Sequence, residues 1–209
     1  MYKLYWAAGT AALAPQAILE EVGAAYEIVT LDLKRQEHRR PEYLALNPAG
    51  LVPTLVTGDG LVLTESAAIT VALCERHPDA GLIPEPGDPA RGTFFRWLFY
   101  LANAVQEAYK RFYFPGRFST DPADAPRIKD QADSDLAARW RIVEDRLADS
   151  GPYLLGARFS AADIFLVMLA TWFESKEDLF EMCPNVGRCF ALAAERPALR
   201  RTLKANGDL

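Results

Sequence analysis

The sequence predicts an α/β domain at residues 1–78, a linker at residues 79–89 and an all-helical domain at residues 90–209. Three observations predict this arrangement. Strand-like and helix-like segments alternate in the N-terminal part. Proline, glycine and acidic residues crowd together without periodicity between Pro78 and Pro89. Beyond them only the helical spacing of apolar residues recurs. The chain has 209 residues, 50% of them hydrophobic, so it can bury a sizeable core.

The amino-acid composition limits which binding partners and which kinds of site the protein can have. The net charge of −5 argues against nucleic acid, which requires a concentrated basic surface. No run approaches the ~20 apolar residues of a membrane span. The N-terminus lacks the charged and apolar regions of an export signal, so we expect a cytoplasmic protein. Three scattered cysteines and two histidines match neither zinc spacing nor a disulfide framework, so no metal is expected.

The first domain begins with a βαβ pattern. Residues 2–6 are strand-like, a loop at residues 7–10 leads to a helix at about residues 11–22, and residues 26–31 form a β-branched second strand. A charged connection at residues 34–40 precedes residues 41–46, whose sequence is compatible with a short helix.

A hairpin and a helix complete the domain. Gly58-Asp59-Gly60 separates two strand-like runs, at residues 54–57 and 61–63, and glycine supplies the positive φ that tight hairpin loops need. Glu65 and Ser66 then precede apolar residues at helical spacing, which predicts a helix from Glu65 to about His77. The resulting order, β-α-β-α-β-β-α, resembles a thioredoxin-like domain.

The second domain shows only helical periodicity, in two long runs around residues 94–109 and 136–147. Ser160 and Asp163 precede the apolar run at residues 164–170 and predict a capping box, with Asp in place of the usual Glu or Gln. We expect that box to stabilise the core helix of this domain.

The stretch from Asn47 to Ser66 combines two features that suit a ligand. Pro53 cannot donate to a strand ladder, so it lies either at the edge of a sheet or at the first residue of a strand, and a backbone edge left open there can pair with a peptide. Glu65 and Ser66 place a carboxylate, a hydroxyl and unpaired backbone N–H groups at a helix N-terminus. Together these groups predict a site for a small peptide-like zwitterion.

These features in this order resemble the glutathione transferase family. The resemblance rests on the thioredoxin-like half, the proline-rich linker, the helical half, the NPxGxVP stretch, the Glu-Ser pair and the SxxD box. It covers essentially the whole chain. The opening LYWAAGTAALAP is most similar to the bacterial beta class.

The resemblance implies contacts with glutathione. The backbone of Val52 would pair antiparallel with the cysteinyl residue, with Pro53 cis. Glu65 and Ser66 would hold the γ-glutamyl end. Glutathione would be a co-substrate, and no other cofactor is implied.

Lys34 or Arg35 would, by the same resemblance, hold the glycyl carboxylate, although a charged run of this kind is more often a solvated loop. The family also implies a homodimer.

The chain departs from the beta class where the chemistry occurs. Ala11 stands at the position of the class's cysteine, and Ala12 at that of the following serine. Gln106 and Glu107 align with the class's histidine and lysine. A mixed disulfide with glutathione at position 11 is therefore excluded.

A transferase needs the thiolate of glutathione, which hydrogen-bond donors and a helix N-terminus stabilise. We predict Thr10 as the donor to the sulfur, beside the backbone N–H groups of Ala11 and Ala12. Tyr5 is the alternative. Because side chains alternate along a strand, only one of Tyr5 and Trp6 can face the ligand, and the sequence does not decide which.

Tyr109, Phe112 and Tyr113 are candidates for an acceptor pocket for a small hydrophobic electrophile. Core aromatics are the alternative interpretation.

The leading functional hypothesis is conjugation of glutathione to such an electrophile. The alternatives are a glutathione-dependent reductase, dehalogenase or isomerase, and a non-catalytic glutathione-binding protein.

Overall fold

The structure, a computed structural model, describes residues 1–208. Contacts between residues divide the chain into two compact units. The first contains Met1–Glu85 and the residues from Leu192 onward, and the second contains Pro86–Ala191. Each unit is described by itself below.

The first unit is built on a four-stranded mixed sheet. Its strands are β1 (Tyr2–Trp6), β2 (Tyr26–Thr30), β3 (Thr54–Val56) and β4 (Val62–Thr64), in the spatial order β2-β1-β3-β4. β1 runs parallel to β2 and antiparallel to β3, and β3 pairs antiparallel with β4. The predicted fold class is confirmed, with strand ends within about one residue of the expected ones.

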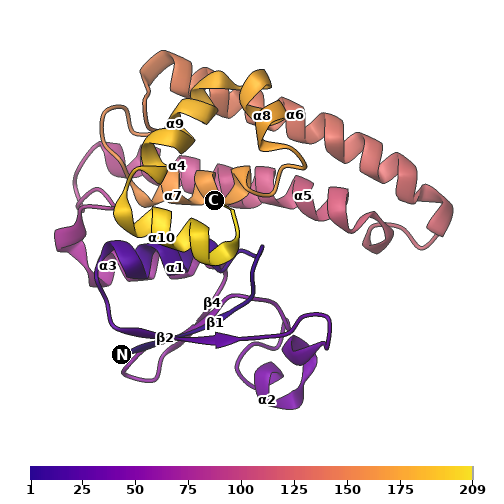
Figure 1. Ribbon diagram of the computed structural model, residues 1–209, viewed down its shortest axis with the longest axis horizontal. Coiled ribbons are helices and arrows are strands. Elements are labelled where there is room, and N and C mark those ends of the chain that lie inside the picture. The colour runs from indigo at the N-terminus through magenta and orange to yellow at the C-terminus, as the bar shows by residue number, and fades with distance from the viewer. Residues whose placement is uncertain (209) are drawn as a thin grey trace. The chain divides into compact units, whose positions relative to one another are not determined.

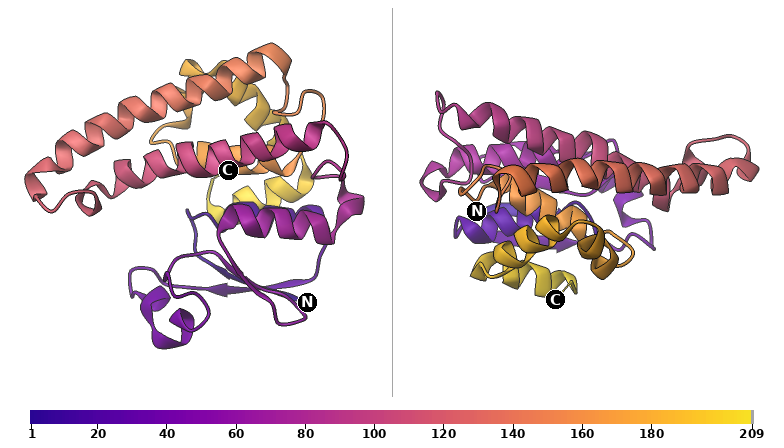
Figure 2. Two further views of the ribbon diagram at one scale, coloured as in Figure 1. Left: turned by 180° about the vertical axis from the view of Figure 1, so that it is seen from behind. Right: turned by 90° about the horizontal axis from the view of Figure 1, so that it is seen from above.

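Helices cover both faces of this sheet. α1 (Leu13–Glu21) and α3 (Ser66–Arg76) lie side by side on one face, and the short α2 (Pro41–Leu44) lies on the other (Figures 1 and 2). Between sheet and helices, an apolar core includes the fully buried Leu4, Leu55, Ile18, Ile69 and Leu73. Burial of such side chains is the main force that holds the layers together.

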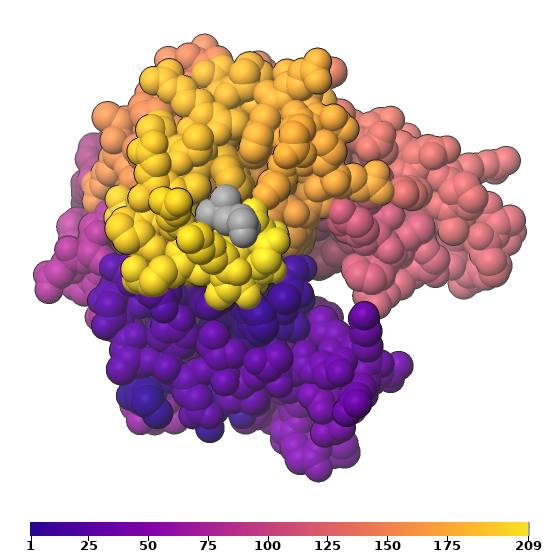
Figure 3. All heavy atoms as spheres, viewed as in Figure 1, coloured from indigo at the N-terminus to yellow at the C-terminus, as the bar shows by residue number. Residues whose placement is uncertain are grey.

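The C-terminal helix α10 (Pro197–Asn206) belongs to the first unit, where it packs against α1. Arg196 binds Glu21 through two nitrogens, at 2.9 and 2.6 Å, and Arg201 binds Glu20 at 2.8 Å. In the space-filling view the yellow C-terminal segment lies directly on the indigo one (Figure 3).

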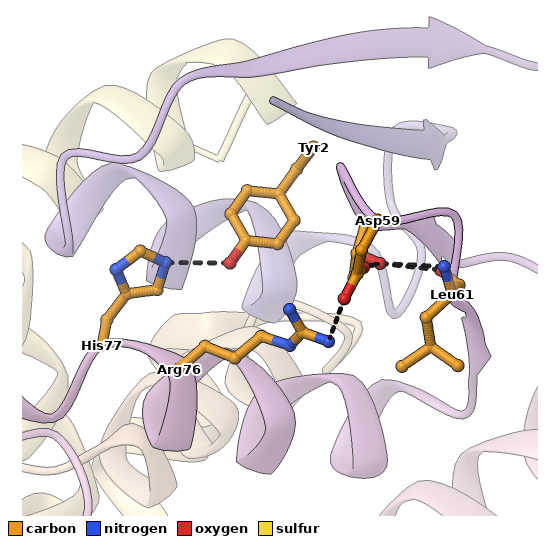
Figure 4. Close-up of polar contacts among 6 residues, drawn as sticks. Tyr2, Asp59, Leu61, Arg76 and His77 are labelled. Carbon is orange, nitrogen blue, oxygen red and sulfur yellow. Dashed lines mark hydrogen bonds and ion pairs between the residues drawn. The ribbon is translucent and has the colours of Figure 1, made fainter.

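The hairpin is fastened to the far end of α3. Its loop spans residues 57–61, with the N–H of Thr57 donating to the carbonyl of Leu61 at 2.9 Å. Arg76 reaches Asp59 in this loop at 3.3 Å, and Tyr2 and His77 hydrogen-bond at 3.0 Å (Figure 4). These contacts fix the end of the sheet opposite Ser66.

The second unit is helical, as predicted. α4 (Ala90–Tyr100) continues through a π-helical turn (Leu101–Val105) into α5 (Gln106–Tyr113), and α5 packs along the long α6 (Ala125–Ser150; Figure 2). α7 (Ala161–Ala170), α8 (Lys176–Met182) and α9 (Pro184–Ala194) follow, with the end of α9 in the first unit. The π turn adds a residue within the helix, which apolar spacing alone did not reveal.

α7 is the core of the second unit, since all ten of its residues are buried. The predicted capping box is present. Asp163 accepts hydrogen bonds from the N–H and hydroxyl of Ser160 at 2.8 and 2.9 Å and from the N–H of Leu154 at 2.8 Å. Burial raises the pKa of Asp163 to about 6, against the opposing effect of these hydrogen bonds. Among residues 1–208, no helix is long and apolar enough to cross a membrane.

Candidate functional site

The backbone of Val52 presents an open edge in the first unit. Val52 immediately precedes Pro53 and β3, and the bond between the two residues is cis, as expected. Within residues 1–208, neither the N–H nor the carbonyl of Val52 has a hydrogen-bond partner. Because backbone polar groups are almost always paired in folded proteins, such an open pair suits an extended peptide ligand.

A buried polar network lies behind this edge. The carbonyl oxygen of Leu51 accepts from the Tyr43 hydroxyl at 2.5 Å and from the Asn47 amide at 2.7 Å. The Thr54 hydroxyl contacts the same two side chains, at 2.8 and 3.2 Å, and the Asn47 oxygen accepts from the N–H of Ala49 at 3.1 Å. Burial raises the pKa of the Tyr43 phenol, which therefore stays protonated and donates.

Glu65 and Ser66 form the helix end expected from the sequence. Glu65 is exposed and has φ +65°, a conformation that costs energy for a residue with a side chain. Its side chain makes no capping hydrogen bond, so the first-turn N–H groups of α3 remain available. Ser66 is buried at the first position of α3. A carboxylate, a hydroxyl and open N–H groups therefore meet at one helix end.

Lys34 and Arg35 lie in the loop between β2 and α2, and both are exposed. Their backbone N–H groups donate to the Asp32 carboxylate at 2.9 and 3.0 Å, which fixes the loop. The Arg35 side chain is 79% exposed, with a loose ion pair to Asp32 at 3.6 Å. Either cation is free to reorient toward an anion, because such an exposed pair contributes little.

In the loop before α1, the Thr10 hydroxyl forms hydrogen bonds within the loop itself. Thr10 donates to the carbonyl of Ala7 at 2.7 Å and accepts from the N–H of Ala12 at 3.3 Å. No acceptor among residues 1–208 takes the N–H of Ala11. The open donor near the α1 N-terminus is therefore the Ala11 N–H, whereas the proton of Thr10 is already shared with Ala7.

Tyr5 and Trp6 lie on opposite faces of β1. The Tyr5 ring packs against Tyr43 on α2, with ring centroids 5.4 Å apart. Trp6 shares the other face with the buried Leu4, and its indole nitrogen has no partner among the described residues. Tyr5 therefore contributes its ring to the support behind the Val52 edge.

The predicted acceptor residues differ in exposure. Tyr109 is 2% exposed and accepts from the Trp140 indole at 3.1 Å, and burial raises its pKa. Phe112 is also buried. Tyr113 is 45% exposed and donates to the carbonyl of Trp172 at 2.5 Å. Of the three, Tyr113 alone offers a large surface.

Gln106 and Glu107 also lie on α5. These are the positions that the family resemblance aligns with the beta class's histidine and lysine. There Glu107 is ion-paired with Lys110 at 3.0 Å. The acid is thus compensated within its own helix turn.

Residues 1–208 contain no group of three or more His, Cys, Asp or Glu side chains arranged to hold a metal ion.

Tyr43 is not among the site residues predicted from the sequence, and Asn47 entered only as the first residue of the NPxGxVP stretch. A single tyrosine in a four-residue helix carries no distinctive pattern. The NPxGxVP spacing was the available signal for Asn47.

Comparison with known proteins identifies the family. Residues 1–71 match the model of the glutathione S-transferase N-terminal domain, and residues 103–201 match a model of the C-terminal domain. Glutathione S-transferase GstA of Escherichia coli O157:H7 is 29% identical over 206 residues, covering 98% of each chain.

Solved structures agree with this assignment. A glutathione transferase homologue from Sulfitobacter with bound glutathione has a TM-score of 0.89 at 29% identity, covering 100% of this chain and 99% of that one. A bacterial beta class glutathione S-transferase from Sphingomonas chungbukensis has a TM-score of 0.83 at 30% identity, covering 99% and 100%. The chain with the open Val52 edge and the Glu65-Ser66 helix end belongs to the glutathione S-transferase family.

Proposed function

We propose that this protein binds glutathione as the thiolate and transfers its sulfur to a hydrophobic electrophile. The observation that carries the proposal is the open N–H and carbonyl of Val52, in the same unit as a helix end with a free carboxylate. A γ-linked tripeptide has a backbone amide to pair with Val52 and an ammonium and a carboxylate for Glu65 and Ser66.

The remaining contacts follow from charge. Glu65 binds the γ-glutamyl ammonium, and Ser66 with the first N–H groups of α3 binds the adjacent carboxylate. Lys34 or Arg35 binds the glycyl carboxylate from the exposed loop. Residues 1–78 form the glutathione-binding domain in this proposal, and residues 79–89 the linker.

The nucleophile is the sulfur of glutathione, because the protein's own thiols are unsuited to the task. Its three cysteines, Cys74, Cys183 and Cys189, are all buried. Burial raises the pKa of Cys74 to about 12 and that of Cys183 to about 11, so both stay protonated at neutral pH. This favours conjugation over disulfide reduction through a protein thiol.

Two donors stabilise the glutathione thiolate. The N–H of Ala11 is open, and the positive end of α1 adds to its effect. Thr10 is the second donor, once its hydroxyl turns from Ala7 to the sulfur. Tyr5 is less suited, since its ring packs toward α2.

The acceptor is a small hydrophobic electrophile bound by aromatic residues of α5, which lies in the helical domain that the sequence predicts at residues 90–209. Tyr113 supplies the exposed ring and Phe112 and Tyr109 the apolar support. We further propose that the protein is a cytoplasmic homodimer, on the basis of the family.

The test is a titration of glutathione with the purified protein, in which thiolate is followed by ultraviolet absorbance as pH is varied. The proposal predicts binding with a thiol pKa well below that of free glutathione, together with conjugation to a model electrophile. Binding with an unchanged pKa would overturn the transferase mechanism. Binding and a lowered pKa without conjugation would point to reductase, dehalogenase or isomerase chemistry. Absence of binding would exclude the proposal altogether.

A further inference from the structure

The amide between Leu51 and Val52 links the buried network to the open edge. The carbonyl of Leu51 and the N–H of Val52 belong to one planar unit, and this bond is not among the cis peptide bonds of the chain. In a trans amide the carbonyl and the N–H point in opposite directions. Whatever holds the Leu51 oxygen therefore also sets the direction of the Val52 N–H.

Two side chains hold that oxygen from the interior. The Tyr43 hydroxyl donates at 2.5 Å and the Asn47 amide at 2.7 Å, and the two residues are 4% and 3% exposed. Buried hydrogen bonds of this kind are costly to leave unmade, so the amide plane has little freedom to rotate.

The network is complete in its donors and acceptors. Tyr43 gives its proton to Leu51, so Thr54, whose oxygen lies 2.8 Å away, gives its own proton to Tyr43. The Thr54 oxygen in turn accepts from Asn47 at 3.2 Å. Thr54 is fully buried in β3, next to Pro53, so the network also joins α2 to the strand that carries the edge.

We propose that Tyr43 is a positioning residue, whose hydroxyl aims the Val52 N–H at the cysteinyl carbonyl of bound glutathione by holding the Leu51 oxygen of the same amide. This inference rests on the proposed function. It adds a residue that touches no substrate and acts through one backbone plane.

The test compares the chain with Tyr43→Phe, using two ligands in calorimetric titrations. One ligand is S-methylglutathione. The other is its analogue with a reduced cysteinyl carbonyl, a CH₂ in place of C=O, which cannot accept from Val52. Tyr43→Phe should weaken S-methylglutathione about fivefold, the factor for one net hydrogen bond, and weaken the reduced analogue much less.

A purely structural role predicts a different pattern. If Tyr43 merely stabilised the fold, Tyr43→Phe would weaken both ligands by the same factor or neither, and either result overturns the inference. Tyr2→Phe is the matched control, because Tyr2 hydrogen-bonds His77 at the other end of the sheet. It should leave the affinity for both ligands unchanged.

The variant Thr54→Val separates the two functions of the network. It keeps both hydrogen bonds to Leu51 while removing the donor to Tyr43, so it should weaken S-methylglutathione less than Tyr43→Phe does. An equal or larger loss would contradict the role of the Leu51 carbonyl. If the unmodified chain bound neither ligand, the proposed function itself would fail. Equal binding changes in a chain that does bind would refute the inference about Tyr43 alone.

Discussion

The Val52 edge and the Ser160-Asp163 box are both polar features beside a helix or strand terminus. They differ in whether the protein itself supplies their hydrogen-bond partners. Both oxygens of Asp163 accept hydrogen bonds from the protein, and the residue is fully buried. Val52 leaves both backbone groups without a partner among the described residues, and Glu65 leaves its carboxylate exposed. Satisfied polar groups stabilise a fold, whereas unused hydrogen-bonding capacity marks a place for a ligand.

The largest effect on stability is expected at the Ser160-Asp163 box, whose polar groups are hydrogen-bonded within the protein. Asp163→Ala leaves two backbone N–H groups and one hydroxyl without an acceptor in the interior. The free energy of unfolding should fall by about 3 kcal/mol, as measured by urea denaturation. Asp135→Ala is the control, since its carboxylate pairs with Arg139 near the surface and should cost less than about 1 kcal/mol. Equal losses in the two variants would refute a special role for the box.

The same carboxyl should make stability depend on pH. Its pKa is about 6 in the folded chain, above the ordinary value of 3.8. Between these two values the folded chain keeps a proton that the unfolded chain has released, so the free energy of unfolding falls as pH rises. The loss should reach up to roughly 3 kcal/mol by about pH 6 and then level off.

The measurement is the difference in unfolding free energy between the chain and Asp163→Asn across this pH range, because the difference cancels other titrating groups. A difference that stays constant from about pH 4 upward would show that Asp163 titrates normally.

At the proposed glutathione site, whose polar groups lack partners in the protein, Ser66→Ala should raise the dissociation constant for glutathione about tenfold. Its hydroxyl has no partner in the protein among the described residues, so the free energy of unfolding should change by less than about 0.5 kcal/mol.

The matched control is Ser175→Ala. Ser175 accepts from the N–H of Asp178 at 3.1 Å and so caps α8. This variant should lose about 1 kcal/mol of stability and keep its affinity for glutathione. If both serines behaved alike, unused hydrogen-bonding capacity would not distinguish ligand contacts from caps.

The smallest effect is expected at Thr10, which lies between the two cases because its hydroxyl is used within its own loop. Thr10→Ala should raise the pKa of the bound glutathione thiol by less than about one unit, since the Ala11 N–H remains. Ultraviolet titration of thiolate measures the shift. A rise with Tyr5→Phe and none with Thr10→Ala would transfer the role to the Tyr5 phenol.

Local patterns predicted the elements that depend on neighbouring residues. The hairpin around Gly58-Asp59-Gly60, the helix after Glu65 and the Ser160-Asp163 box are each specified within a few positions, and the structure contains all three. The cis bond before Pro53 followed from the family resemblance.

What remained hidden depends on packing between distant residues or on competition for a proton. Tyr43 meets Thr54 only because α2 folds back onto β3, and the sequence cannot show that contact. Nor could it show that Thr10 donates to Ala7. The buried state of Tyr109 likewise depends on Trp140, which lies on another helix.

The return of α10 to α1 has a consequence for the rate of folding. Arg196 and Arg201 form ion pairs with Glu21 and Glu20, which lie 175 and 181 positions earlier in the sequence. The unit that carries the Val52 edge is therefore closed by contacts of long sequence separation. Such contacts form late and slow folding, because a long loop must be closed before they can stabilise the chain.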